Sequence, residues 1–66
     1  MTGAAPMVPI SAQIKCVERE LTFRRRVYAR RVSQGKMTQH KADEELQAMG
    51  AVLCTLQNIE ASQRLI

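Results

Sequence analysis

Two long segments without proline, separated by one glycine turn, constrain the fold of this chain most strongly. Residues 12–33 contain neither Gly nor Pro, and Gly35 then follows as the left-handed residue typical of a helix end. Thr38 is a candidate N-cap for a second segment, which continues without Pro to residue 62 or 63 and is interrupted only by Gly50. The segments predict an all-α fold, an antiparallel hairpin of two helices.

The residues before the first helix have a different composition. Gly3, Pro6 and Pro9 are typical of an arm without structure of its own, and Ser11 is the predicted N-cap of the first helix. We therefore divide the 66-residue chain into a flexible N-terminal arm, residues 1–10, and a single helical-hairpin domain, residues 11–66. One domain of this size is too small for its own cleft with a buried general base, so we expect no enzyme activity.

The apolar residues indicate that the hairpin associates with itself. In the second helix they follow alternate spacings of four and three, which predicts one seam: Ala42, Leu46, Met49, Leu53 and Leu56. The first helix has two stripes more than a quarter turn apart. One stripe comprises Ile14, Val17, Leu21, Tyr28 and Val32, and the other Ala12, Cys16, Phe23 and Val27. A hairpin covers only one of them, so the pattern predicts a homo-oligomeric helix bundle and leaves open its subunit number and which stripe faces the hairpin interior.

The chain has few residues suited to metal or redox chemistry. Cys16 and Cys54 lack metal-ligand spacing, and His40 is the only histidine, so we expect no metal site and no cofactor. Two small buried thiols are the expected state of the cysteines, with a disulfide between the helices as the alternative. No apolar run approaches the ~20 residues that span a bilayer, and the first residues lack the pattern of a secretory signal. These features predict a cytoplasmic protein.

An arginine cluster dominates the charge of the chain, which is +4 from ten Lys/Arg and six Asp/Glu. It lies within 13 positions and comprises Arg19, Arg24, Arg25, Arg26, Arg30 and Arg31. One interpretation is internal pairing, since Glu20 precedes Arg24 by four residues. Another is an anion pocket at the oligomer interface, because arginine forks match phosphate oxygens. A third is non-specific nucleic-acid binding, which the two aromatic residues support weakly.

The turn between the helices is a further candidate. Gly35, Lys36, Met37 and Thr38 precede a helix N-terminus, where free N–H groups favour an anion, although a simple helix cap with a solvated lysine is the more ordinary interpretation. The turn lacks the upstream glycine and strand of a nucleotide triphosphatase loop. The candidate ligand-binding residues are Arg24, Arg25, Tyr28, Arg31 and Lys36.

Several positions in and around this segment also match a sequence pattern of other proteins. The matching positions are Val27, Tyr28, Arg30, Gly35, Lys36, Met37, Ala42 and Asp43. Over residues 14–56 the chain resembles a group of short proteins of tailed phages and prophages, which have approximately Arg-x-x-Val-Tyr-Pro-Arg, then Gly-Lys-Met, then a second amphipathic helix. Ala29 stands where proline is expected. The resemblance implies a phage origin, and with it a role in binding rather than catalysis.

Together these expectations define a working hypothesis. The chain is a phage-encoded homo-oligomer in the host cytoplasm that sequesters a phosphate-bearing, nucleotide-type ligand without turnover, as an anti-defence protein. Small phage oligomers that sequester nucleotide immune signals are similar in outline only. The alternatives are an inhibitor that binds a host protein and a DNA- or RNA-binding accessory protein.

Overall fold

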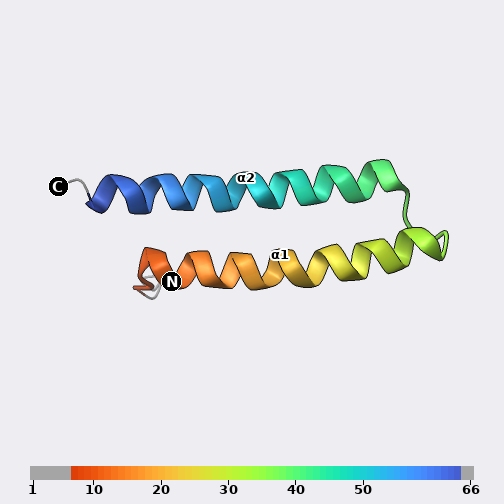
Figure 1. The fold of residues 1–66 in the computed structure, drawn as a ribbon, viewed down its shortest axis with the longest axis horizontal. Helices are drawn as coiled ribbons and strands as arrows, with labels where there is room; N and C mark the ends of the chain where they lie inside the picture. The colour runs from red at the N-terminus through yellow and green to blue at the C-terminus, as the bar shows by residue number, and fades with distance from the viewer. Residues whose placement is uncertain (1–6, 65–66) are drawn as a thin grey trace, which may run out of the picture.

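The structure, a computed structural model that describes residues 7–64, consists of two helices packed side by side. Helix α1 spans Ile10–Ser33 and helix α2 spans Gln39–Arg64, and they run antiparallel from a single connection at one end (Figure 1). The described residues contain no strand. The predicted all-α hairpin is therefore confirmed.

The beginning of α1 differs from the prediction. The Pro9 carbonyl accepts hydrogen bonds from the N–H groups of Ala12 (3.0 Å) and Gln13 (3.1 Å). Pro9 is thus the N-cap, Ile10 is the first helical residue, and Ser11 lies inside the helix, so the prediction of Ser11 as N-cap was wrong. Proline suits this place because it needs no N–H acceptor and its fixed φ is compatible with a helix start. Of the predicted arm, residues 1–6 lie outside the described part of the chain.

Gly35 ends α1 as predicted. Its φ of +72° lies in the left-handed region, where a Cβ is unfavourable. The N–H groups of Gly35 and Lys36 donate to the carbonyls of Val32 (3.0 Å) and Arg31 (2.8 Å), so these carbonyls at the end of α1 have hydrogen-bond donors. The chain can then reverse direction within five residues, 34–38.

The hairpin core is small and lies along one seam. Among the described residues only Ile14, Leu21 and Ala42 are buried, with 8%, 5% and 2% of their surface exposed. Half-buried residues extend the seam: Val17, Tyr28 and Val32 on α1, and Leu46, Met49, Leu53 and Leu56 on α2. The stripe that contains Ile14 and Leu21 therefore faces the hairpin interior.

The second stripe of α1 stays largely uncovered. Phe23 is 60% exposed, Ala12 and Cys16 are exposed, and Val27 is half-buried. Cys54 is exposed as well, and neither thiol forms a disulfide. Within a single hairpin, the predictions of two buried thiols and, alternatively, of a disulfide between the helices were thus wrong. The reason is geometric, because a two-helix hairpin covers one face of each helix and both cysteines lie off that face.

Neither described helix combines the length and the apolar composition needed to cross a bilayer.

A methyl group added at Gly35 and one added at Gly50 should have opposite effects on the stability of the hairpin. A Cβ at Gly35 or at Gly50 would meet no atom within 4 Å, so only the backbone decides. We expect Gly35→Ala to lower the free energy of unfolding by about 1–2 kcal/mol because of its positive φ. We expect Gly50→Ala, within α2, to raise it by about 0.5–1 kcal/mol. Urea unfolding followed by circular dichroism measures both, and a loss of stability in Gly50→Ala would reveal a neighbour close to that helix face.

Candidate functional site

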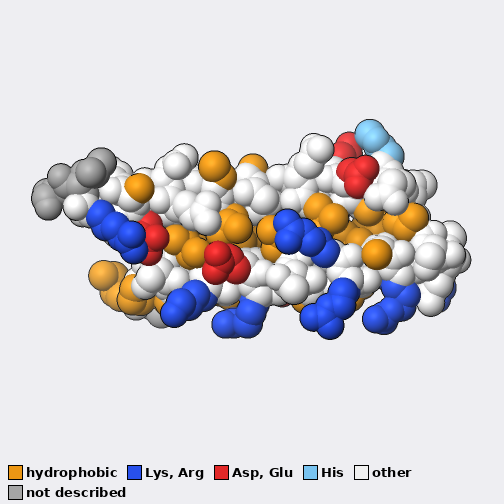
Figure 2. Space-filling view, in the orientation of Figure 1, with side chains coloured by type: hydrophobic (Ala, Val, Ile, Leu, Met, Phe, Trp, Pro, Cys, Tyr) orange, Lys and Arg blue, Asp and Glu red, His pale blue; other side chains and the backbone are white. Residues whose placement is uncertain are grey.

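Charge is divided unequally between the helices. Helix α1 has seven basic and two acidic residues, a net charge of +5, whereas α2 has two basic and four acidic residues, a net charge of −2. Figure 2 shows basic side chains in a row along the α1 edge, with hydrophobic side chains between the two helices. The electrostatic potential therefore favours an anionic ligand on the α1 side of the molecule.

One member of the arginine cluster is paired within the chain. The Nε atom of Arg24 donates to Oε1 of Glu20 at 2.8 Å, and the Arg24 side chain is 34% exposed beside the seam. The hydrogen bond to Glu20 raises the pKa of Arg24 above its ordinary value, and neighbouring Tyr28 contributes in the same direction. Internal pairing is thus confirmed for Arg24, whose guanidinium already has an acidic partner.

The other arginines of the cluster are exposed and differ from Arg24 in this respect. Among residues 7–64 none of them has a carboxylate oxygen within 4.0 Å: Arg19, Arg25, Arg26, Arg30 and Arg31. Their charges remain available to a ligand or a partner.

One of these arginines, Arg31, lies at the turn together with two lysines. An open hollow of about 610 Å³, which we call the turn hollow, is lined by Arg31, Gly35, Lys36, Met37, Thr38 and Lys41. Of the five predicted ligand residues, it brings Arg31 and Lys36 together. Arg24, Arg25 and Tyr28 do not line it, and Tyr28 is half-buried on the seam.

The start of α2 forms one wall of the turn hollow. Thr38 Oγ1 accepts a hydrogen bond from the Lys41 N–H at 3.1 Å, which confirms Thr38 as the N-cap. The Thr38 carbonyl accepts from the Ala42 N–H at 3.0 Å. The N–H groups of Gln39 and His40 find no acceptor within the helix, so the positive end of the α2 dipole adds to the charge of the hollow.

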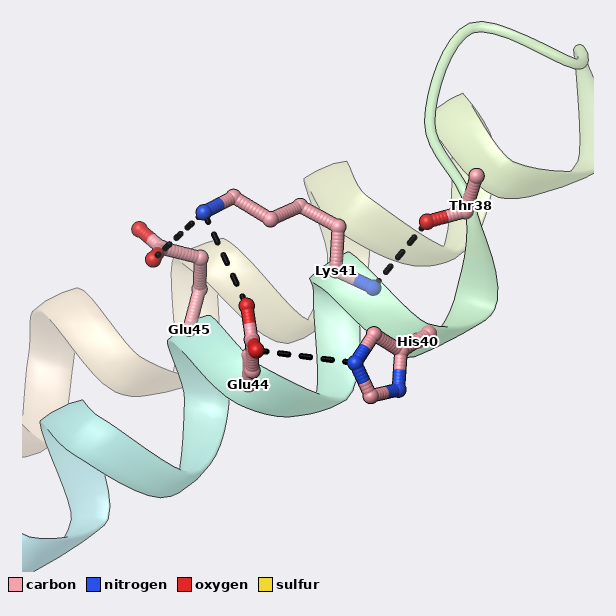
Figure 3. Close-up of polar contacts among 5 residues, drawn as sticks. All are labelled: Thr38, His40, Lys41, Glu44 and Glu45. Carbon is pink, nitrogen blue, oxygen red and sulfur yellow. Dashed lines mark hydrogen bonds and ion pairs between the residues drawn. The ribbon is translucent and has the colours of Figure 1, made fainter.

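Lys41 is a member of the hollow that the sequence analysis missed. Its Nζ lies 3.5 Å from a carboxylate oxygen of Glu45 and 3.8 Å from one of Glu44, whereas its backbone N–H is held by Thr38 (Figure 3). Glu44 also lies 3.5 Å from Nε2 of His40. The signal was present in the sequence, since Lys41 occupies the third position after the cap and so returns to the side of Thr38.

Two other hollows are less suited to an anion. One, of about 530 Å³ on the outer side of α1, includes Glu18 among Lys15, Arg19 and Arg26. The other, of about 550 Å³, is largely apolar and lies between the helices. The described residues contain no group of three His, Cys, Asp or Glu side chains arranged to hold a metal ion.

Comparisons with protein-family models, with curated proteins and with solved structures found no match for this chain.

The Thr38 cap predicts a measurable contribution to the turn. Replacement by Ala removes the acceptor of the Lys41 N–H, and we expect Thr38→Ala to lower the free energy of unfolding by about 1 kcal/mol. Thr22→Ala is the matched control, because Thr22 Oγ1 donates only to the Glu18 carbonyl within α1. We expect that control to be neutral or slightly stabilising. Equal losses in the two variants, measured by urea unfolding, would contradict a capping role.

Proposed function

We propose that this chain is a small self-associating protein that binds a phosphate-bearing anion at the turn hollow and does not convert it. The observation that carries the proposal is that Arg31 and Lys36, neither of them paired with a described carboxylate, share one open hollow at the start of a helix. Cations and helix N–H groups together are the common means of holding phosphate oxygens. Arg31 supplies a planar fork, and Lys36 a mobile point charge.

The remaining sequence-based candidates take other roles in this proposal. Arg24 is committed to Glu20, and Tyr28 supports the seam of the hairpin rather than a ligand base. Arg25 is exposed outside the hollow. The proposed ligand is therefore defined by its phosphate groups. A nucleotide-type ligand is the candidate that the phage resemblance favours, with sequestration in the cytoplasm of a bacterial host as the biological role.

The proposal predicts a specific loss of phosphate binding. With ATP and inorganic pyrophosphate as probes, we expect Arg31→Ala and Lys36→Ala each to raise Kd at least about tenfold, since a hydrogen bond to a charged group contributes about 1.5–3 kcal/mol. Arg24→Ala should leave Kd within about twofold, because its charge is already paired. Isothermal titration calorimetry at two salt concentrations measures these changes.

Arg19→Ala is the matched control for charge. It removes one exposed arginine from the same helix, about 18 Å from Arg31 at 1.5 Å per residue. Equal weakening in Arg19→Ala and Arg31→Ala would contradict a local site. If both probes fail to bind while a DNA or RNA oligonucleotide binds with steep salt dependence, the chain is a nucleic-acid accessory protein instead. If none of these anions binds, the alternative of a host-protein inhibitor gains support.

A further inference from the structure

One face of the hairpin is apolar and uncovered, and we call it the open face. Its floor is the groove between the helices, lined by Val8, Ala12, Gln13, Cys16, Val17, Val52 and Leu56. Val52, which lines this groove, is 49% exposed, and Ile59, two helical turns further along the same side of α2, is 40% exposed. Exposed apolar residues that line one continuous groove are typical of a surface that another protein covers.

The surface of the chain indicates how large the covering partner is. The chain exposes 5253 Å², whereas a globular protein of 7.4 kDa exposes about 4,200 Å². The excess of about 1,000 Å² is close to the ~800 Å² that each partner contributes to a standard interface. The radius of gyration, 15.3 Å, likewise exceeds the ~11 Å of a compact 66-residue domain. A partner of similar size on the open face would bring the hairpin to the proportions of a globular protein.

We infer that the open face binds a second copy of the chain, related by a two-fold axis parallel to the helices, so that each α1 packs on the partner's α2. This inference rests on the self-association in the proposed function and adds its geometry. Two hairpins can pack face to face about a two-fold axis in the plane of the interface in two ways. In the first arrangement, the one inferred here, the axis runs parallel to the helices. In the second arrangement, with the axis across the helices, each α1 would pack on the partner's α1.

Charge selects between the two arrangements. Packing of α1 on α1 would juxtapose two helices of net charge +5, whereas packing of α1 on the partner's α2 juxtaposes +5 and −2. Like charges across an interface cost free energy, and opposite charges fix its register. The uneven charge of the two helices therefore favours the axis parallel to them.

The charges also match along the length of the helices. Cys16 on α1 lies at the level of Val52 and Leu56, since all three line one groove. Helix α2 runs antiparallel to α1. Arg26, ten residues after Cys16 on α1, therefore lies at the level of residues 42–46, which come ten residues before Val52 and Leu56 on α2. With the axis parallel to the helices, residues 24–26 of the partner's α1, all arginines, come to the level of the α2 segment that contains Asp43, Glu44 and Glu45. The level of greatest positive charge on one copy would thus coincide with the level of greatest negative charge on the other.

This arrangement has a consequence for the ligand site. An axis parallel to the helices brings the two turns to the same end of the four-helix bundle, whereas the other axis separates them by the length of the bundle. Both turn hollows, each with Arg31 and Lys36, would then face one region of solvent. The doubled cluster suits a ligand with several phosphate groups, because each copy can hold one end of it.

Thiol reactivity tests which face is covered. Cys16 lies in the groove of the open face, and Cys54 is exposed outside it, so both thiols would react at similar rates in a lone hairpin. In the assembled protein we expect iodoacetamide to modify Cys54 at least about tenfold faster than Cys16. Peptide mass spectrometry assigns the two sites. Equal rates, or faster reaction at Cys16, at concentrations where sedimentation shows an oligomer would overturn the open face as the interface.

Spin labels test the direction of the axis. On a Cys16→Ala, Cys54→Ala background, a label at Gln39 marks the start of α2 in each copy. We expect a distance below about 25 Å between the two labels, since neighbouring helix axes lie 8–10 Å apart. The opposite arrangement predicts about 40 Å, the length of a 26-residue helix. A label at Ala51, near the middle of α2, is the control, because it gives a short distance in both arrangements.

The outcomes separate this inference from the proposed function. A distance near 40 Å at Gln39 with a short distance at Ala51 would overturn the axis and leave self-association standing. The absence of any dipolar signal would overturn self-association itself. Phosphate binding is decided separately by the Arg31 and Lys36 variants, so a correct dimer without phosphate affinity would leave the geometry standing and contradict the proposed ligand.

Discussion

The structure depends on one line of apolar contact between two helices. Ile14 and Leu21 are the only buried residues described on α1, and Ala42 is the only one on α2. The small side chain of Ala42 lets the helices approach closely just after the turn. A core of this size barely offsets the conformational entropy of two long helices. The proposed self-association would make the hairpin half of a stable unit and would account for the exposure of Val52.

Much of this architecture could be predicted from the sequence because helices leave a periodic pattern. The spacing of Leu46, Met49 and Leu53 and the position of Gly35 located the seam and the turn, and the structure agrees. The start of α1 could not be fixed in the same way. Ser11 and Pro9 are both acceptable near a helix N-terminus, and the choice between them depends on where the preceding carbonyl points.

The candidate site was harder to predict because the charged residues, unlike the apolar ones, do not repeat with the period of a helix. Arginines that adjoin in sequence point to different sides of a helix, so the cluster divides into Arg24, paired with Glu20, and five exposed residues. Only the fold of the turn shows that Arg31 and Lys36 share a hollow with Lys41. The burial of Cys16 was mispredicted for a related reason. A periodic pattern shows that a stripe is apolar, but it does not show whether the hairpin itself covers that stripe.

The division of charge joins the two proposals physically. Two turn hollows at one end of a bundle place at least four cations, Arg31 and Lys36 of each copy, near one another. Their mutual repulsion would oppose assembly, whereas attraction between the basic α1 of one copy and the acidic α2 of the other would favour it. A ligand with several phosphate groups would relieve the repulsion only when both copies are present. Binding of such a ligand and dimer formation would then stabilise each other to the same extent, as linkage requires.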